Sequence, residues 1–99
     1  MDIELTELEG VTVISLSGRL DTTTAPDLDA AATKLFESGV YDIRVDMADC
    51  EFVSSAGLRV IVAMQKHVMG KGSLVFANVK PEVMDVFDMT GFTKILTIE

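Results

Sequence analysis

The amino-acid sequence predicts an α/β protein with a mixed, mostly parallel β-sheet, and three observations support this fold class. Hydrophobic residues alternate with polar residues in some segments and recur at helical spacing in others. These segments follow one another in the order β-β-α-β-α-β-α-β. Strands that alternate with helices require crossovers between parallel strands, whereas the short first connection predicts an antiparallel hairpin at the N-terminus.

The length and composition indicate one globular domain. The chain has 99 residues, of which 48% are hydrophobic and 24% charged, so we expect a single domain over residues 1–99 with a modest core. The formal net charge of −8 repels a phosphate backbone, and direct nucleic-acid binding is therefore not expected. This charge favours solubility, or alternatively a partner with a basic surface.

Three further features predict a cytoplasmic protein. Cys50 is the only cysteine, so the chain cannot form an internal disulfide. Residues 1–4 are acidic where a signal peptide would be basic. No hydrophobic run approaches the roughly 18 residues that a membrane-spanning helix needs, and membrane insertion is therefore not expected.

The first two strands are predicted from alternation. Ile3 and Leu5 alternate with polar residues, which indicates a half-buried strand, and Glu9-Gly10 can turn the chain. Residues 11–17 carry hydrophobic side chains on both faces, which is typical of a more central strand. Residues 18–24 are interpreted as a polar connection.

The first helix is expected to begin at Thr24, a good N-cap residue, with Pro26 and Asp27 in the first turn. Gly39 is expected to end it as the residue after the C-cap. The predicted hydrophobic stripe of this helix consists of Leu28, Ala31, Ala32, Leu35 and Phe36.

Residues 41–47 alternate most regularly and predict the clearest strand. A second helix is predicted after Ser54 and Ser55, and Gly70 to Gly72 should stop it. Arg59 and Lys66 are expected to lie away from the core. The predicted hydrophobic stripe consists of Leu58, Ile61, Val62, Val68 and Met69.

The C-terminal third is expected to hold two strands and a helix. Residues 74–77 are a short hydrophobic run typical of a buried strand, and residues 95–98 predict a last strand. Between them, Pro81 near the first helical position and Gly91 at the end delimit a third helix. Its hydrophobic face is predicted to contain Val83, Val86 and Phe87.

The two adjacent serines are the main candidates for function. Either Ser54 or Ser55 can cap the second helix. A phosphate added there would meet unpaired backbone N–H groups and the positive end of the helix dipole. The alternative is that both serines only cap the helix.

Catalytic, metal and nucleotide sites are not indicated. His67, the only histidine, follows Ser55 by twelve residues on the same predicted helix, roughly 18 Å along its axis, so the two cannot form a dyad. One cysteine and one histidine do not have zinc-site spacing, and the acidic residues between 42 and 49 do not match a calcium loop. No phosphate-binding loop motif is present.

Two charged residues have open interpretations. Asp21 can make local hydrogen bonds in a turn, or it can orient a serine hydroxyl or its attacker. Arg59 lies four residues after Ser55, where it can contact a phosphate or a partner's carboxylate, or it can simply be a surface arginine.

Residues 52–61, Phe-Val-Ser-Ser-Ala-Gly-Leu-Arg-Val-Ile, resemble the signature of STAS domains, the family of anti-sigma-factor antagonists. In that signature an Asp precedes a phosphorylatable Ser, which is followed by a small residue, Gly and Leu. Ser54 takes the position of the Asp, and Ser55 that of the phosphorylated Ser. The segment from Ser17 to Asp21 also resembles the family's Gly-x-Leu-Asp turn, and the order of elements matches over nearly the whole chain. The resemblance implies a STAS-like fold.

The resemblance also implies a binding module, not an enzyme, and no cofactor. When unphosphorylated, such a protein binds an anti-sigma factor with serine-kinase activity, and a sigma factor is released. Phosphorylation of Ser55 ends the complex, and a PP2C-type phosphatase resets the switch. The implied neighbours of the phosphosite are Asp21, Ser54, Ala56 and Gly57, and the implied partner-binding residues are Ser55, Leu58, Arg59 and Val60. The alternative is a non-switching accessory or scaffold subunit of a lipid-transport or stress-signalling assembly.

Overall fold

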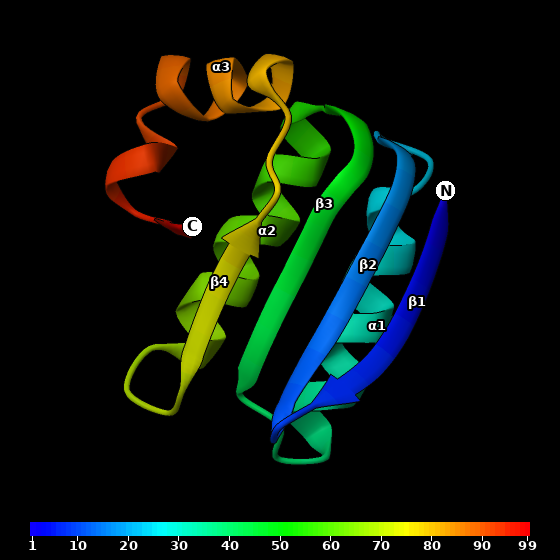
Figure 1. The fold of residues 1–99 in the computed structure, drawn as a ribbon, viewed down its shortest axis with the longest axis vertical. Coiled ribbons are helices and arrows are strands. Elements are labelled where there is room, and N and C mark those ends of the chain that lie inside the picture. The colour runs from blue at the N-terminus through cyan, green and yellow to red at the C-terminus, as the bar shows by residue number, and fades with distance from the viewer.

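A computed structural model describes residues 1–99 and contains one five-stranded sheet in the order β1-β2-β3-β4-β5 (Figure 1). Strand β1 pairs with β2 in the antiparallel direction, and every other pair is parallel, which confirms the predicted fold class. The elements are β1 (Asp2–Leu8), β2 (Val11–Leu20), α1 (Ala25–Glu37), β3 (Asp42–Val53), α2 (Ser55–Val68), β4 (Ser73–Ala77), α3 (Pro81–Met89), the 3₁₀ helix η1 (Phe92–Lys94) and β5 (Thr97–Ile98).

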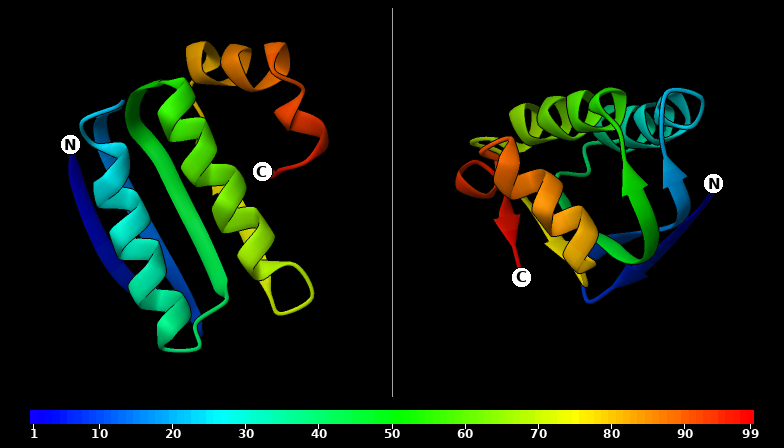
Figure 2. Two further views of the ribbon diagram at one scale, coloured as in Figure 1. Left: turned by 180° about the vertical axis from the view of Figure 1, so that it is seen from behind. Right: turned by 90° about the horizontal axis from the view of Figure 1, so that it is seen from above.

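Helices α1 and α2 lie side by side on one face of the sheet, and the opposite face is open (Figure 2). The sequential strand order explains this arrangement. From β2 onward, each connection places the next strand beside the previous one, always toward the same edge of the sheet. Because such crossover connections share one handedness, the helices α1 and α2 that they contain lie on the same face of the sheet. Helix α3 lies across the end of the sheet where β3 gives way to α2 (Figure 1).

The hydrophobic core fills the space between these two helices and the sheet. Strand residues Ile14, Val45 and Phe76 are at most 1% exposed, as are Leu28 of α1 and Ile61 of α2. The predicted stripe of α1 is confirmed at its centre, since Leu28 and Ala32 are both buried.

The predicted stripe of α2 is partly wrong. Met69 follows the last helical residue and is 66% exposed, whereas Met64 is buried and was not predicted. Because the helix ends at Val68, Met69 leaves the helical path and no longer follows the hydrophobic face.

Both strands that lead to the candidate site are longer than predicted. Strand β2 continues to Leu20 through the segment interpreted as a polar connection, and β3 continues to Val53. Arg19 and Leu20 pair with Phe52 and Val53 after two irregularities in the register. The guanidinium of Arg19 lies 4.1 Å from the centre of the Phe52 ring. The polar segment that ends β2 therefore contacts β3 through a cation–π interaction.

The C-terminal strand is shorter than predicted, because residues 92–94 form a 3₁₀ helix and β5 begins at Thr97.

A bidentate ion pair between Arg44 of β3 and Glu99 fixes the C-terminal residue against the sheet, and Arg44 Nη1 lies 2.8 Å from Glu99 Oε2. The hydrogen bonds from Arg44 lower the pKa of Glu99, and the same contact raises the pKa of Arg44.

Candidate functional site

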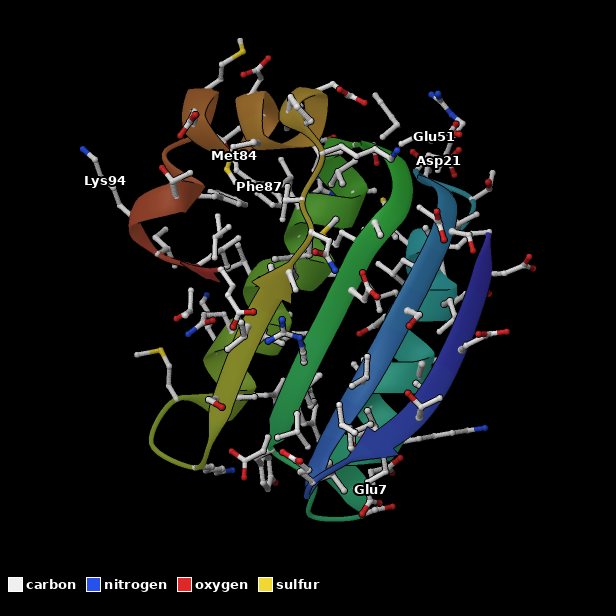
Figure 3. All side chains as sticks on the ribbon, in the orientation of Figure 1. Glu7, Asp21, Glu51, Met84, Phe87 and Lys94 are labelled. Carbon is white, nitrogen blue, oxygen red and sulfur yellow. The ribbon has the colours of Figure 1, made fainter.

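The candidate site lies at the end of the sheet where β2 and β3 terminate and α2 begins. Ser54 N donates a hydrogen bond to Leu20 O at 2.8 Å, so the start of α2 is tied to the end of β2. Figure 3 shows Asp21 and Glu51 at this same end of the molecule. Segments far apart in sequence therefore meet around the two serines.

Ser54 is the N-cap of α2. Its backbone is extended (φ −88°, ψ 174°), its Oγ accepts a hydrogen bond from Gly57 N at 3.2 Å, and its carbonyl accepts one from Leu58 N at 2.9 Å. An Asp at this position would also cap the helix. The serine therefore preserves the cap of the STAS signature but removes one negative charge beside Ser55.

Ser55 is the first residue of α2, and its side chain is exposed. Because Ser54 provides the cap, the Ser55 hydroxyl is not needed to hold the helix. The amides of Ser55 and Ala56 belong to the first turn, where backbone N–H groups lack intrahelical partners. A phosphate on Ser55 would thus be close to donors and to the positive end of the helix dipole.

Gly57 allows α2 to approach β2 closely. A Cβ atom at this position would lie 2.8 Å from Leu20 Cγ and 3.0 Å from Leu20 O. Both distances are shorter than van der Waals contact, and one of the two atoms belongs to the backbone. The glycine of the signature is therefore required for packing.

Replacing Gly57 with Ala is expected to destabilise the protein by about 1–3 kcal/mol, because the added methyl group overpacks the contact with Leu20. Urea unfolding followed by circular dichroism measures this change. Ser55→Ala, an exposed substitution in the same helical turn, is the control and should stay within about 0.5 kcal/mol of wild type. Equal stability of Gly57→Ala and wild type would contradict the close packing.

Asp21 and Thr24 together organise the start of α1. Thr24 is the N-cap residue, as predicted, but its side chain makes no capping hydrogen bond, since Thr24 Oγ1 donates to Arg19 O and accepts from Asp21 N. Asp21 O accepts from Ala25 N at 2.8 Å, and Asp21 Oδ1 accepts from Thr23 N and Thr24 N. Asp21 therefore makes the local hydrogen bonds of a turn, while its role toward Ser55 stays a prediction.

The hydrogen bonds that Asp21 accepts lower its pKa, and those from Thr23 have a larger effect than those from Thr24. A carboxyl whose pKa is lower in the folded state stabilises that state above its unfolded pKa and loses this contribution as the pH falls through its folded pKa. Asp21→Ala should therefore lower the Tm at about pH 7 and change it much less at about pH 2.5. Asp29→Ala, on the exposed side of α1, is the control. The same Tm difference at both pH values would contradict a role for the ionised carboxylate.

The three other predicted partner-binding residues differ in exposure. Arg59 is exposed and has no carboxylate within 4 Å, so its guanidinium is free to contact another molecule. Val60 is half-buried against the core. Leu58 is only 7% exposed and belongs to the core, so it offers a partner little surface.

A groove beside α2 adds Lys66, Phe92 and Ile95 to the candidate site, and none of these three was predicted to belong to it. Phe92 and Ile95 come from the C-terminal segment and line the groove together with Ser55, Arg59 and Lys66 of α2. About thirty residues separate the two walls. A local sequence pattern cannot predict a contact between segments so far apart in the chain. The hydrophobic residues Phe92 and Ile95, which lie outside any predicted helix, were a weak indication that this segment packs against another element.

Two further side chains, His67 and Cys50, are potentially reactive. His67 is in the last turn of α2, at the far end from Ser55, and its ring stacks on Phe36 with centroids 4.8 Å apart. Burial raises the pKa of the Cys50 thiol, which favours the unreactive protonated form.

Residues 1–99 contain no cluster of three or more His, Cys, Asp and Glu side chains placed to hold a metal ion. None of the helices has both the length and the hydrophobicity that crossing a membrane requires.

Comparisons with known proteins find relatives that match nearly the whole chain. The chain is 28% identical over 99 residues to BtrV of Bordetella bronchiseptica, covering 99% of this chain and 85% of that protein. It is 29% identical over 99 residues to the anti-sigma-B factor antagonist of Bacillus subtilis, covering 99% of this chain and 90% of that protein.

Two solved structures share the fold. TM1081 of Thermotoga maritima matches with a TM-score of 0.91 at 19% identity, covering 97% of this chain and 84% of that one. The phosphorylated form of SpoIIAA from Bacillus matches with a TM-score of 0.74 at 19% identity, covering 99% of this chain and 91% of that one. The family model of the STAS domain matches residues 2–99, and the chain belongs to this family.

Proposed function

We propose that this protein is an anti-sigma factor antagonist that acts as a phosphoserine-controlled binding module. In its unphosphorylated form it binds an anti-sigma factor with serine-kinase activity, and the phosphorylated form releases that partner. The observation that supports this proposal most strongly is that the two serines have different roles. The side chain of Ser54 caps α2, whereas the hydroxyl of Ser55 is exposed and is not needed for the cap, so it is available for modification.

The partner kinase performs the chemistry in this proposal. It transfers the γ-phosphoryl group of ATP to Ser55 Oγ, the serine proton passes to a base of the kinase, and ADP leaves. A PP2C-type phosphatase then hydrolyses the phosphoserine with water, which restores Ser55 and releases inorganic phosphate. The chain contributes the hydroxyl and the docking surface, and neither role needs a general base beside Ser55.

Phosphorylation would act mainly on the complex and little on the fold. The phosphate adds roughly 1.5 to 2 negative charges to a surface that contacts the partner. In the free protein, the first-turn amides and the helix dipole stabilise this charge by about 0.3–1 kcal/mol at an exposed site. In the complex, an uncompensated buried charge costs about 3–5 kcal/mol. The complex is therefore expected to dissociate while the domain stays folded.

A pull-down tests this function. Ser55→Ala should retain its partner on the resin without being phosphorylated, and mass spectrometry should identify a small ATPase with kinase activity. Ser55→Asp is the matched bait and should recover much less of it. Recovery of the same transporter or stress-signalling assembly by both baits would instead support the non-switching scaffold, and the proposed switch would be wrong.

A further inference from the structure

Figure 2 shows the C-terminal segment beside α2, and a groove lies between the two on the exposed side of α2. One wall is formed by α2 and includes Val62 and Ala63, and the other includes Phe92 and Ile95. The groove has a volume of about 560 Å³, and Ile95 is 55% exposed beside it. It therefore presents hydrophobic side chains to solvent on the surface that includes Ser55.

The charge of the groove differs from that of the whole molecule. The chain carries 16 acidic and 8 basic residues, yet the groove has no acidic lining residue and two basic ones, Arg59 and Lys66. Neither cation has a carboxylate within 4 Å. Arg59 and Lys66 are seven residues apart on one helix, so they lie on the same side, roughly 10 Å apart along the axis.

We propose that this groove binds an acidic amphipathic helix of the partner kinase, an inference that rests on the proposed function. Such a helix can place hydrophobic residues into the groove at i, i+3, i+4 and i+7, and carboxylates two turns apart opposite Arg59 and Lys66. The net charge of −8 opposes a large anionic surface such as a membrane or a nucleic acid. A short acidic helix avoids that repulsion because it contacts only the locally basic region.

The position of Ser55 at the end of this groove links binding to phosphorylation. Arg59 follows Ser55 by four residues, so the two side chains are neighbours on the helix surface. A phosphate on Ser55 can form a charge-assisted contact with Arg59 and thereby compete with a carboxylate of the partner. Phosphorylation would then remove a docking contact as well as add charge.

Titration of variants against the purified kinase recovered by Ser55→Ala tests the groove. Lys66→Glu and Ile95→Asp should each weaken binding by about tenfold or more, since one reverses a groove charge and the other removes a hydrophobic contact. Lys34→Glu changes a lysine in the last turn of α1, and Met89→Asp changes an 86% exposed methionine on α3. These matched controls should stay within about threefold of wild type. Thermal melts should show all four variants folded.

Hydrogen exchange on the kinase identifies the occupant. An amphipathic acidic helix of the kinase should be protected by wild type and less protected by Lys66→Glu, and Lys substitution of its facing carboxylates should restore binding of Lys66→Glu. Protection of a non-acidic segment would overturn the proposal, as would binding of the free protein to phosphatidylserine-containing vesicles through Lys66. Wild-type binding by both groove variants, with Ser55→Asp still impaired, would overturn the groove but leave the proposed function intact. Failure of wild type to bind any kinase would overturn both.

Discussion

Ser55→Asp is expected to weaken binding of the partner kinase by roughly 10²- to 10³-fold. The estimate follows from a cost of about 3–5 kcal/mol for an uncompensated charge in a buried contact, at about 1.4 kcal/mol per tenfold change. Ser55 is exposed in the first turn of α2, where the helix dipole tolerates a carboxylate, so the domain should remain folded. Titration calorimetry with the purified kinase measures the loss.

Two controls separate the position of the charge from its presence. Ser55→Ala adds no charge and should bind at least as well as wild type. Ser54→Asp places the same carboxylate one residue earlier, at the N-cap, where it restores the residue of the STAS signature and can still accept from Gly57 N. Ser54→Asp should therefore retain binding. An equal loss for both Asp variants would indicate general repulsion rather than a switch at Ser55.

Arg59→Glu is expected to weaken binding by about tenfold to a hundredfold, because hydrogen bonds to charged groups contribute about 1.5–3 kcal/mol. Stability should change by less than about 0.5 kcal/mol, since Arg59 is exposed and makes no ion pair within the chain. Calorimetry and urea unfolding measure the two effects separately. Lys71→Glu, beyond the opposite end of α2, is the matched charge reversal and should bind normally. Unchanged binding by Arg59→Glu would place the interface away from this face of α2.

Much of the fold could be predicted because its local signals agree. The alternation in residues 41–47 and Pro81 at the start of a helix both correspond to observed elements. The errors occur where tertiary contacts override local character. The segment Gly18–Leu20 looks polar, but it extends β2 because it pairs with β3 and because Arg19 stacks on Phe52. Thr24 is the N-cap of α1, as its residue type predicts, but its hydroxyl bonds to Arg19 O and Asp21 N and not to the first-turn amides.

The candidate site shows the same division. Two serines before a helical pattern predicted a helix N-terminus, but only the structure assigns the cap to Ser54 and leaves Ser55 free. The signature glycine acquires a physical reason only once Leu20 is seen within 3 Å of the missing Cβ. The groove between α2 and Ile95 was beyond sequence reasoning, because its walls are far apart in the chain.

Phosphopeptide mapping after incubation with the partner kinase and ATP tests whether Ser55 is the modified residue. We expect one phosphate on Ser55 in wild type, none in Ser55→Ala, and continued phosphorylation of Ser55 in Ser54→Ala, with slower transfer if loss of the cap loosens the first turn of α2. Phosphate retained in Ser55→Ala but lost in Ser54→Ala would show that Ser54, and not Ser55, is the phosphorylated serine.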